Sequence, residues 1–152
     1  MEHNSVLRPM KIEDVTNMKV RDVELSRVSL KAFLPEMRTN MKEGPSFTLE
    51  VDGKVIWCGG IRVFWEGVGE AWCLISDEGA RMPKTVFSSI KKILDFVQKD
   101  LALHRVQATA RIDIPMFHKF LEHLGFEREG VLRKFLADGT DSYIYSRVRE
   151  NG

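Results

Sequence analysis

The segment from Ser76 to Pro83 combines residue types that can bind an anion. It reads Ser-Asp-Glu-Gly-Ala-Arg-Met-Pro and follows a compact apolar run, Glu70–Ile75, that is typical of a buried strand. Its first four residues, 76–79, predict a tight turn in which the glycine takes positive φ. A proline then stands where the first turn of a helix tolerates a missing N–H. A strand that enters a helix through such a turn directs backbone N–H groups at one point, which suits a phosphate or another anion. An ordinary strand–loop–helix connection is the alternative interpretation.

The helix that must follow this turn is predicted over 84–100, because apolar residues recur there at helical spacing. We expect the helix to pack on one face of a sheet with Phe87, Ile90 and Leu94 of this apolar stripe buried, and Lys91 and Lys92 to be exposed. The stripe consists of Val86, Phe87, Ile90, Ile93, Leu94, Val97 and Leu101.

The N-terminal third predicts a short edge strand and two helices without a recognisable motif. Val6–Pro9 is the strand, since proline is confined to sheet edges and strand ends. Helical sequence begins at Lys11 and continues to Phe33, where Pro35 interrupts it. Leu34–Met41 forms a second short helix. These helices could shape an acceptor site, but a solvated helical face is the favoured interpretation.

The middle of the chain, 46–75, predicts three antiparallel strands. Asp52-Gly53 and the segment 66–69 provide the hairpin turns. Gly59-Gly60, inside the second of these strands, indicates a bulge or a close backbone contact.

The C-terminal part returns to strands around one more helix. A strand over 105–110 is followed by a helix that Asp113 can cap and that Gly125 ends, and a final hairpin turns at Asp138-Gly139. The order is therefore β α α β β β α β α β β. The β–α–β segment around 84–100 requires a crossover, so we expect a mixed α/β (α+β) domain that covers residues 1–152.

Bulk properties exclude several classes of protein. A chain of 152 residues with 23 Lys and Arg against 22 Asp and Glu has a net charge of +1, which gives no reason to expect nucleic acid or a membrane surface as a partner. No apolar run reaches the roughly 20 residues of a membrane span. The N-terminus lacks the apolar core of a signal peptide, which favours a cytoplasmic location. Cys58 and Cys73 lie in apolar stretches without metal-ligand spacing, so we expect them to be small buried hydrophobic residues.

The C-terminal sequence resembles the GNAT (Gcn5-related N-acetyltransferase) superfamily. The similar stretches are RVQATARIDIPMFHKFLEHLGFEREGVLRKF and the following DGTDSYIYSRV, together with the opening LRPMKIEDV. The resemblance implies a twisted, mostly antiparallel sheet of about seven strands with about four helices. It also implies acetyl-CoA as the donor and a primary amine of an unidentified acceptor. A narrower likeness to phage and prophage GNAT-like proteins allows a virion-associated location.

The resemblance also implies where the coenzyme binds. The pantetheine arm would lie between the fourth and fifth strands and pair with the edge of Trp72–Ile75, and the pyrophosphate would lie on 76–82 and the start of helix 84–100. The coenzyme-binding residues implied in this way are Trp72, Cys73, Leu74, Ile75, Ser76, Gly79, Ala80, Arg81, Met82 and Phe117.

This loop departs from the superfamily's usual glycine-rich pattern. It has one glycine, the two acids Asp77 and Glu78 that repel phosphate, and Pro83 that removes a donor. Arg81 can offset part of this loss through charge-assisted hydrogen bonds.

The following helix departs from the pattern as well. Ile114 and Leu121 occupy the positions where the superfamily often carries an Asn and a Tyr that serves as general acid. Phe117 stands where a small residue is usual, so it narrows the pantetheine channel.

Two residues are the candidate catalytic groups. Glu70 lies near the position where some GNAT enzymes carry a catalytic carboxylate, and a solvated hairpin residue is the alternative interpretation. Tyr143 and Tyr145 lie on the last strand, where we expect one to face the core and the other the cleft or solvent, and we select Tyr143 as the acid. His118 and His123 point in different directions on one helix, so they form no metal pair and both should be surface residues.

Two functions follow from these residues. One is acetyl transfer from acetyl-CoA to an amine. The other is a non-catalytic, phage-type structural or interaction module that keeps the fold and has a degenerate cofactor loop. A homodimer is compatible with both.

Overall fold

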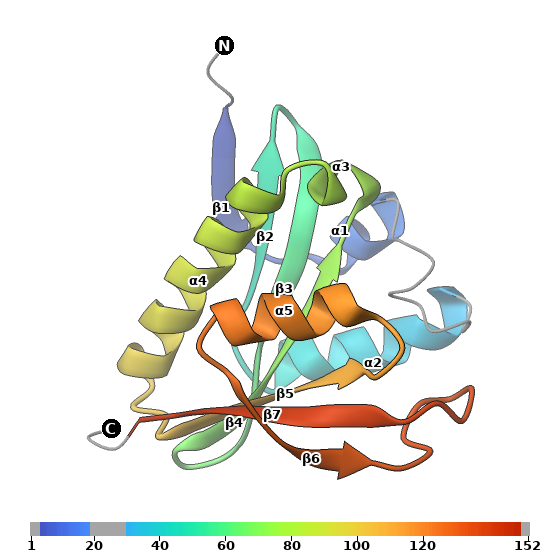
Figure 1. Ribbon diagram of the computed structural model, residues 1–152. Coiled ribbons are helices and arrows are strands. Elements are labelled where there is room, and N and C mark those ends of the chain that lie inside the picture. The colour runs from blue at the N-terminus through green and yellow to red at the C-terminus, as the bar shows by residue number, and fades with distance from the viewer. Residues whose placement is uncertain (1–3, 19–29, 150–152) are drawn as a thin grey trace.

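A single seven-stranded sheet organises the chain in the computed structural model, which describes residues 4–18 and 30–149 (Figure 1). The strand order is β1-β2-β3-β4-β5-β7-β6, and every neighbouring pair is antiparallel except β4 and β5. The strands are β1 (Ser5–Pro9), β2 (Ser46–Val51), β3 (Lys54–Trp65), β4 (Val68–Ile75), β5 (Arg105–Arg111), β6 (Glu127–Leu132) and β7 (Ser142–Val148). The helices are α1 (Ile12–Asn17), α2 (Leu30–Lys42), α3 (Asp77–Ala80), α4 (Pro83–Asp100) and α5 (Pro115–His123).

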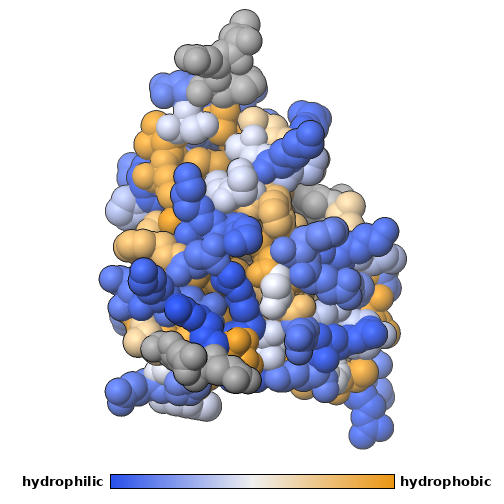
Figure 2. All heavy atoms as spheres, turned by 60° about the vertical axis from the view of Figure 1, so that its left-hand side comes forward, coloured by the Kyte–Doolittle hydropathy of each residue, from blue (hydrophilic) through white to orange (hydrophobic). Residues whose placement is uncertain are grey.

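Helices cover the sheet on both faces. On one face α4 and α5 pack over the central strands, with Leu94 and Leu124 in the core cluster. On the other face α1 and α2 pack over β3 and β4, where Val15 and Met37 meet Cys58. The side of the molecule that carries α4 is mostly hydrophilic, with scattered apolar groups between the polar side chains (Figure 2). The predicted order of elements is confirmed, and α3 is one short helix more than predicted. Within the described ranges, no helix is both long and apolar enough to span a membrane.

The predicted hairpin turn at Asp52-Gly53 and the predicted helix end at Gly125 are confirmed by backbone angles. Asp52 and Gly53 have φ of 51° and 80°, the left-handed pair that a two-residue hairpin requires. Gly125 has φ of 95° directly after α5.

Gly59 and Gly60 are required by close contacts rather than by a bulge between them. A Cβ on Gly59 would lie 2.4 Å from the carbonyl oxygen of Trp72, and one on Gly60 would lie 2.2 Å from that of Pro45. The register shift between β2 and β3 lies elsewhere, between Leu49 and Glu50. These glycines therefore allow β3 to approach both of its neighbours.

Three predictions at the helix ends are wrong. Pro35 does not interrupt a helix but lies inside α2, near its start. Helix α1 ends at Asn17, and the apolar positions predicted to extend it over 20–28 lie outside the described residues. Asp113 does not cap α5, because its carboxylate pairs with Arg111 at 3.0 Å.

Helix α4 buries its stripe only in part. Val86, Leu94 and Val97 are buried, but Phe87 and Ile90, which we expected to be buried, are half-buried. On the outer face Lys92 is exposed as expected, but Lys91 is half-buried beside Asp95 (2.9 Å). Leu101, beyond the last turn, is 40% exposed.

Candidate functional site

Strands β4 and β5 pair only at one end. Their parallel ladder consists of Val68, Gly69 and Glu70 opposite Arg105, Val106 and Gln107. Beyond Glu70 the strands part, and among the described residues those of β4 from 71 to 75 have no strand partner on that side. Backbone N–H and C=O groups of an unpaired edge are available to another extended chain.

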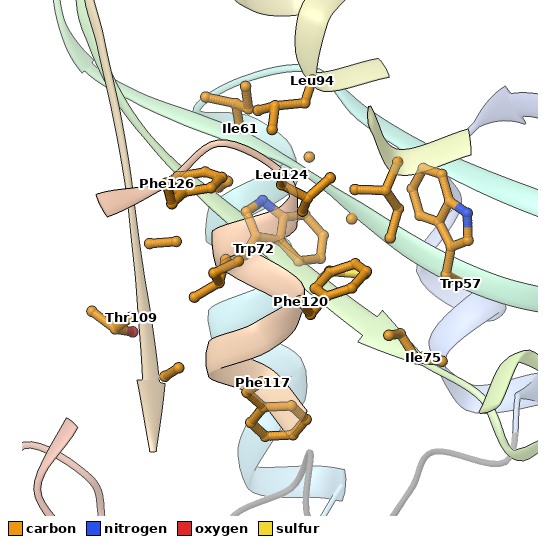
Figure 3. Close-up of a pocket in the computed structure, with 18 of the residues that line it drawn as sticks. Trp57, Ile61, Trp72, Ile75, Leu94, Thr109, Phe117, Phe120, Leu124 and Phe126 are labelled. Carbon is orange, nitrogen blue, oxygen red and sulfur yellow. The ribbon is translucent and has the colours of Figure 1, made fainter. Parts of the chain in front are cut away.

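A cavity of about 240 Å³ lies where the strands part (Figure 3). Consecutive residues of both strands line it, 71–73 of β4 and 108–111 of β5, so the two open edges face it. Helices α4 and α5 enclose it with apolar side chains, and the rings of Trp57, Trp72, Phe117 and Phe120 surround it. The arrangement suits an extended molecule that has amide groups along its length and apolar surface beside them.

The predicted pantetheine residues divide between this cavity and the core. Trp72, Cys73, Ile75 and Phe117 line the cavity. Leu74 does not, because alternation along β4 directs its side chain to the opposite face, where it is buried against α1.

The loop after β4 is not the open anion-binding turn that we predicted. Ser76 is fully buried and caps α3, and its Oγ accepts from the N–H of Gly79 at 3.1 Å. The N–H groups of Ala80, Arg81 and Met82 also donate to carbonyl oxygens within 76–79, at 2.9–3.1 Å. The N–H groups of this segment are therefore engaged internally, and the expectation that they are free is wrong.

Glycine is needed at position 79 for a different reason than we predicted. Gly79 does not take positive φ. A Cβ there would lie 2.4 Å from the carbonyl oxygen of Ile56, so glycine is needed for the contact between α3 and β3.

The anion-binding groups that remain belong to α4 and to side chains. In the part of the chain that the structure describes, the N–H groups of Lys84 and Thr85 have no backbone acceptor, because they lie in the first helical turn. Ala80 and Arg81 are exposed beside them, and Met82 is half-buried against the core. Asp77 and Glu78 lie in α3 next to the same turn and oppose a negative ligand.

Glu70 is the last residue of β4 that pairs with β5, at the level where the strands part. Its side chain lies on the α2 face of the sheet, the face that Leu74 shares, and it does not line the cavity. It is half-buried, and burial raises the pKa of its carboxyl group. The charge of Arg62 and a hydrogen bond with Gln107 lower that pKa in part, and Glu36 of α2 raises it. A carboxylate of raised pKa at the edge of a cleft can accept a proton from an ammonium group.

Tyr143 lies on the other face of the sheet. Gln107 of β5 pairs with Ser146, and residues 143 and 145 alternate with Ser146 along β7, so both tyrosines face α5. Residues two apart on a strand share a face, so the expectation that the two tyrosines point to different faces is wrong, although only Tyr145 is fully buried in the core. Tyr143 packs under Arg128, whose guanidinium carbon is 4.2 Å from the ring centroid, and it does not line the cavity. The structure does not bring Glu70 and Tyr143 together.

His118 is not the surface residue that we expected. Its Nδ1 lies 2.7 Å from the hydroxyl oxygen of Tyr145, which is fully buried, and its ring stacks on that tyrosine. His123 is exposed as expected, with its ring edge-on to Phe87. In the described ranges, no three His, Cys, Asp or Glu side chains are grouped so that they could hold a metal ion.

Sequence reasoning missed the partners of Glu70. Arg62 and Gln107 lie opposite it on the two neighbouring strands, and Glu36 approaches from α2. None belongs to a local motif, because each contact depends on strand register or helix packing.

Two unpaired polar atoms at the cavity were missed for the same reason. Among the described residues, the buried Trp72 Nε1 and Ser142 Oγ have no hydrogen-bond partner, although both residues line the cavity.

Comparisons with known proteins find the same fold in solved structures of acetyltransferases. No sequence family model matches the chain, and no curated protein matches it significantly in sequence. Solved structures do match. An acetyltransferase of the GNAT family from Bacillus anthracis is 15% identical with a TM-score of 0.73, and the match covers 97% of each chain. The ribosomal-protein-S5-alanine acetyltransferase from Vibrio fischeri is 18% identical with a TM-score of 0.71, over 99% of this chain and 96% of that one. A variant of the spermidine N-acetyltransferase from Vibrio cholerae is 17% identical with a TM-score of 0.70, over 95% of this chain and 93% of that one.

These similarities extend over nearly the whole chain at low sequence identity. The chain has the GNAT fold, a mixed α/β fold with a seven-stranded, mostly antiparallel sheet. The resemblance found in the sequence is thereby confirmed for the fold.

Proposed function

We propose that the protein is an acyltransferase that moves an acetyl group from acetyl-CoA to a primary amine of an acceptor. The observation that carries the proposal is the parting of β4 and β5 beyond Glu70, with a cavity between their open edges. The named activities of the structural neighbours support acyl transfer, and one of them acts on spermidine, an amine. We further propose that the protein works in the cytoplasm.

The open edge of β4 supports binding of the donor through its pantetheine arm. That arm carries two amide groups, which require hydrogen-bond partners when they leave water. The backbone of Ala71–Ile75 offers such partners in the manner of a neighbouring strand. The pyrophosphate would then meet the first turn of α4 and the side chain of Arg81. Because Asp77 and Glu78 lie at this turn, we expect weaker binding than a glycine-rich loop would give.

Glu70 is the proposed base. The ammonium group of the acceptor would lose a proton to its carboxylate, directly or through water, and the free amine would attack the thioester carbonyl carbon. The C–N bond forms and the C–S bond breaks, the nitrogen loses its second proton to water, and the thiolate of coenzyme A takes a proton from water or from a tyrosine of β7. Tyr143 remains our prediction for that tyrosine, although it lies on the face opposite Glu70. Loss of a well-placed acid typically slows such reactions a hundredfold or more, so we expect slow turnover.

A second candidate is a non-catalytic module that keeps the fold. Leu121 lines the cavity where the superfamily often carries a tyrosine, and it cannot donate a proton. The internally bonded loop at Gly79–Met82 favours this candidate as well.

Calorimetry with acetyl-CoA tests donor binding. We expect measurable heat at millimolar ligand, and we expect Arg81→Ala to weaken binding by about 1–3 kcal/mol, the contribution of one charge-assisted hydrogen bond. Lys92→Ala is the matched control, since Lys92 is an exposed cation on α4 away from its first turn. An absence of heat, or equal affinity in the parent and Arg81→Ala, would refute this placement of the donor.

Thiol release from acetyl-CoA tests turnover. A panel of polyamines, amino acids and peptides with a free N-terminus serves as acceptor, and we expect release above the rate of hydrolysis with at least one. Binding of acetyl-CoA without release by any acceptor would favour the non-catalytic module.

A further inference from the structure

The polar part of the cavity lies on the α2 face of the sheet. The lining side chains with N–H or O–H groups are those of Trp72, Thr109, Arg111 and Ser142. Trp72 of β4 (Figure 3) packs with Leu74 against the core cluster under α1 and α2. On β5, Ala110 belongs to the core under α4 and α5, so alternation directs Arg111 to the α2 face. Ser142 is the direct partner of Arg111 across the β5–β7 ladder and shares its face.

Two of these polar groups lack a partner within the protein. Among the described residues, Trp72 Nε1 and Ser142 Oγ are buried atoms without a hydrogen bond, and Ser142 is fully buried. Buried polar atoms are nearly always paired in native proteins, so an unpaired one that lines a cavity points to a ligand. An indole N–H can only donate. The ligand on this side must therefore offer an oxygen to Trp72, and it can offer a second one to the Ser142 hydroxyl.

These groups continue a line that starts at Glu70. Trp72 follows two residues later on the same face of β4, about 7 Å further along the strand. Ser142 lies opposite Arg111, which is four residues, about 13 Å, beyond Gln107, the partner of Glu70. The proposed pantetheine arm uses the backbone edge of β4 and arrives from the first turn of α4, on the other face. The α2 face therefore remains for the acceptor.

The start of this line suits an ammonium group. Glu36 of α2 acts on Glu70 electrostatically, and Arg62 also approaches it. Arg62 is itself paired with Glu43. Carboxylates thus outnumber the cation here, and a positively charged ligand group is attracted.

The far end of the line suits a neutral oxygen. The Arg111 guanidinium is bound by Asp113 and by Asp138, each at 3.0 Å. Two carboxylates therefore outweigh its charge, and a ligand carboxylate would be repelled. A carbonyl oxygen can accept from the Ser142 hydroxyl without this repulsion.

We propose that the acceptor is the free N-terminus of a peptide, with its amino group at Glu70 and its carbonyl oxygens bound by Trp72 Nε1 and Ser142 Oγ. An extended peptide advances about 3.3 Å per residue, so its first four residues span the line. A polyamine has no oxygen for the Trp72 N–H, and a free amino acid is too short to reach Ser142. The inference rests on the proposed function, since it names the acceptor of that acetyl transfer.

Thiol release with two matched acceptors tests the class of substrate. Alanine amide and tetra-alanine amide carry the same N-terminal residue, but only the longer one reaches Ser142. We expect kcat/KM to be about tenfold higher for tetra-alanine amide, the effect of one added hydrogen bond. Equal values for the two amides, or release with spermidine alone, would overturn the inference while leaving the proposed function intact. Release with no acceptor at all would instead refute the proposed function, and this inference with it.

Ser142→Ala and Trp72→Phe test the two groups separately. Ser142→Ala should remove most of the advantage of tetra-alanine amide, and Trp72→Phe should lower kcat/KM for both amides about tenfold. Ser88→Ala and Trp65→Phe are the matched controls, because both residues are exposed and neither lines the cavity.

Two further measurements separate this assignment from its alternatives. Coenzyme A affinity, measured by calorimetry, should stay within about twofold of the parent in both variants, because the arm pairs with backbone groups. A loss of coenzyme A affinity with unchanged peptide kinetics would show that these donors bind the pantetheine arm, and would overturn the inference. The unfolding midpoint of Ser142→Ala should not fall, since the hydroxyl has no partner to lose. This variant therefore decides the question even if Trp72→Phe does not fold.

Discussion

Glu70 and Gln107 face each other at the last paired position between β4 and β5, and their side chains share a hydrogen bond. Beyond this pair the two strands have separate edges. Burial raises the pKa of Glu70 and the hydrogen bond with Gln107 lowers it in part, so the carboxyl group keeps a pKa above its usual range. The pair thus fixes a titrating group at the point from which the cleft opens.

Glu70→Gln should lower turnover about a hundredfold and leave coenzyme A affinity nearly unchanged, because a general base acts mainly in the transition state. In the parent, the rate should rise with pH as Glu70 loses its proton, and this limb should be absent from the variant. Thiol release measured across the acidic to neutral range tests both points. Glu66→Gln, which removes an exposed carboxylate at the β3–β4 turn, is the control and should behave as the parent. Equal rates in the parent and Glu70→Gln would exclude Glu70 from the mechanism.

Asp14 is expected to be a main source of stability near the N-terminus. Its carboxylate is buried and accepts hydrogen bonds from Arg8 (2.7 and 2.9 Å), from the N–H of Lys11 (2.8 Å) and from Thr48 Oγ1 (2.8 Å). Burial raises the pKa of Asp14, but these hydrogen bonds outweigh burial and lower it to about 2. We expect Asp14→Asn to reduce the free energy of unfolding by about 2–4 kcal/mol at neutral pH.

The pH dependence of this contribution has a definite sign. Because the pKa is lower in the folded state, the stabilisation is complete above about pH 4 and is lost as the pH falls towards 2. The free energies of unfolding of the parent and of Asp14→Asn, measured with urea, should therefore differ at pH 7 and converge at pH 2. Glu13→Gln removes an exposed neighbouring carboxylate and should change the midpoint little. A difference in unfolding free energy between the parent and Asp14→Asn that is the same at pH 2 as at pH 7 would contradict this account.

The parts of the fold that are set by local sequence could be predicted. The stripe of α4, the Asp52-Gly53 hairpin and the turn at Gly125 each depend on residues within one element. The parting of β4 from β5 could not be predicted from local sequence, because the apolar run 70–75 looks the same whether or not it is paired, and only the family resemblance implied it. The role of Gly79 was also hidden, since the atom that excludes a side chain belongs to Ile56, far away in the sequence. Glu70 could be proposed as a catalytic residue from its position at the start of the apolar run. Its partners Arg62 and Gln107 could not be predicted, because they depend on the register between neighbouring strands.

Gly59→Ala should disturb the strand edge that faces the cleft. The added Cβ would lie 2.4 Å from the carbonyl oxygen of Trp72, so β3 and β4 must separate. We expect a loss of about 2 kcal/mol or more in unfolding free energy and weaker acetyl-CoA binding, as overpacking at backbone contacts is not relieved by rotamer changes. Gly130→Ala is the control, because the nearest atom to its Cβ is a side-chain methyl at 4.0 Å. Similar unfolding midpoints for the two variants would show that β3 and β4 tolerate the added carbon.

The two cysteines should differ sharply in reactivity. Cys58 is fully buried, with its Sγ 3.3 Å from Met18 Sδ, and burial raises the pKa of its thiol to about 12. It therefore holds almost no thiolate at neutral pH, and the thiolate is the reactive form. Cys73 is half-buried and lines the cavity. Iodoacetamide should accordingly alkylate one site in the native protein, and Cys73→Ser should abolish the labelling while Cys58→Ala should leave it unchanged.

Acetyl-CoA should slow this alkylation, because a pantetheine arm along β4 would cover the Cys73 thiol. Mass spectrometry of the intact protein over time, with and without acetyl-CoA, measures the rate, and free acetate is the control for unspecific protection. The slowing should follow the binding curve from calorimetry. Labelling at an unchanged rate with saturating acetyl-CoA would mean that the donor does not pass between β4 and β5. Labelling of Cys58 at a rate similar to that of Cys73 would mean that the core under α1 opens faster than its packing implies.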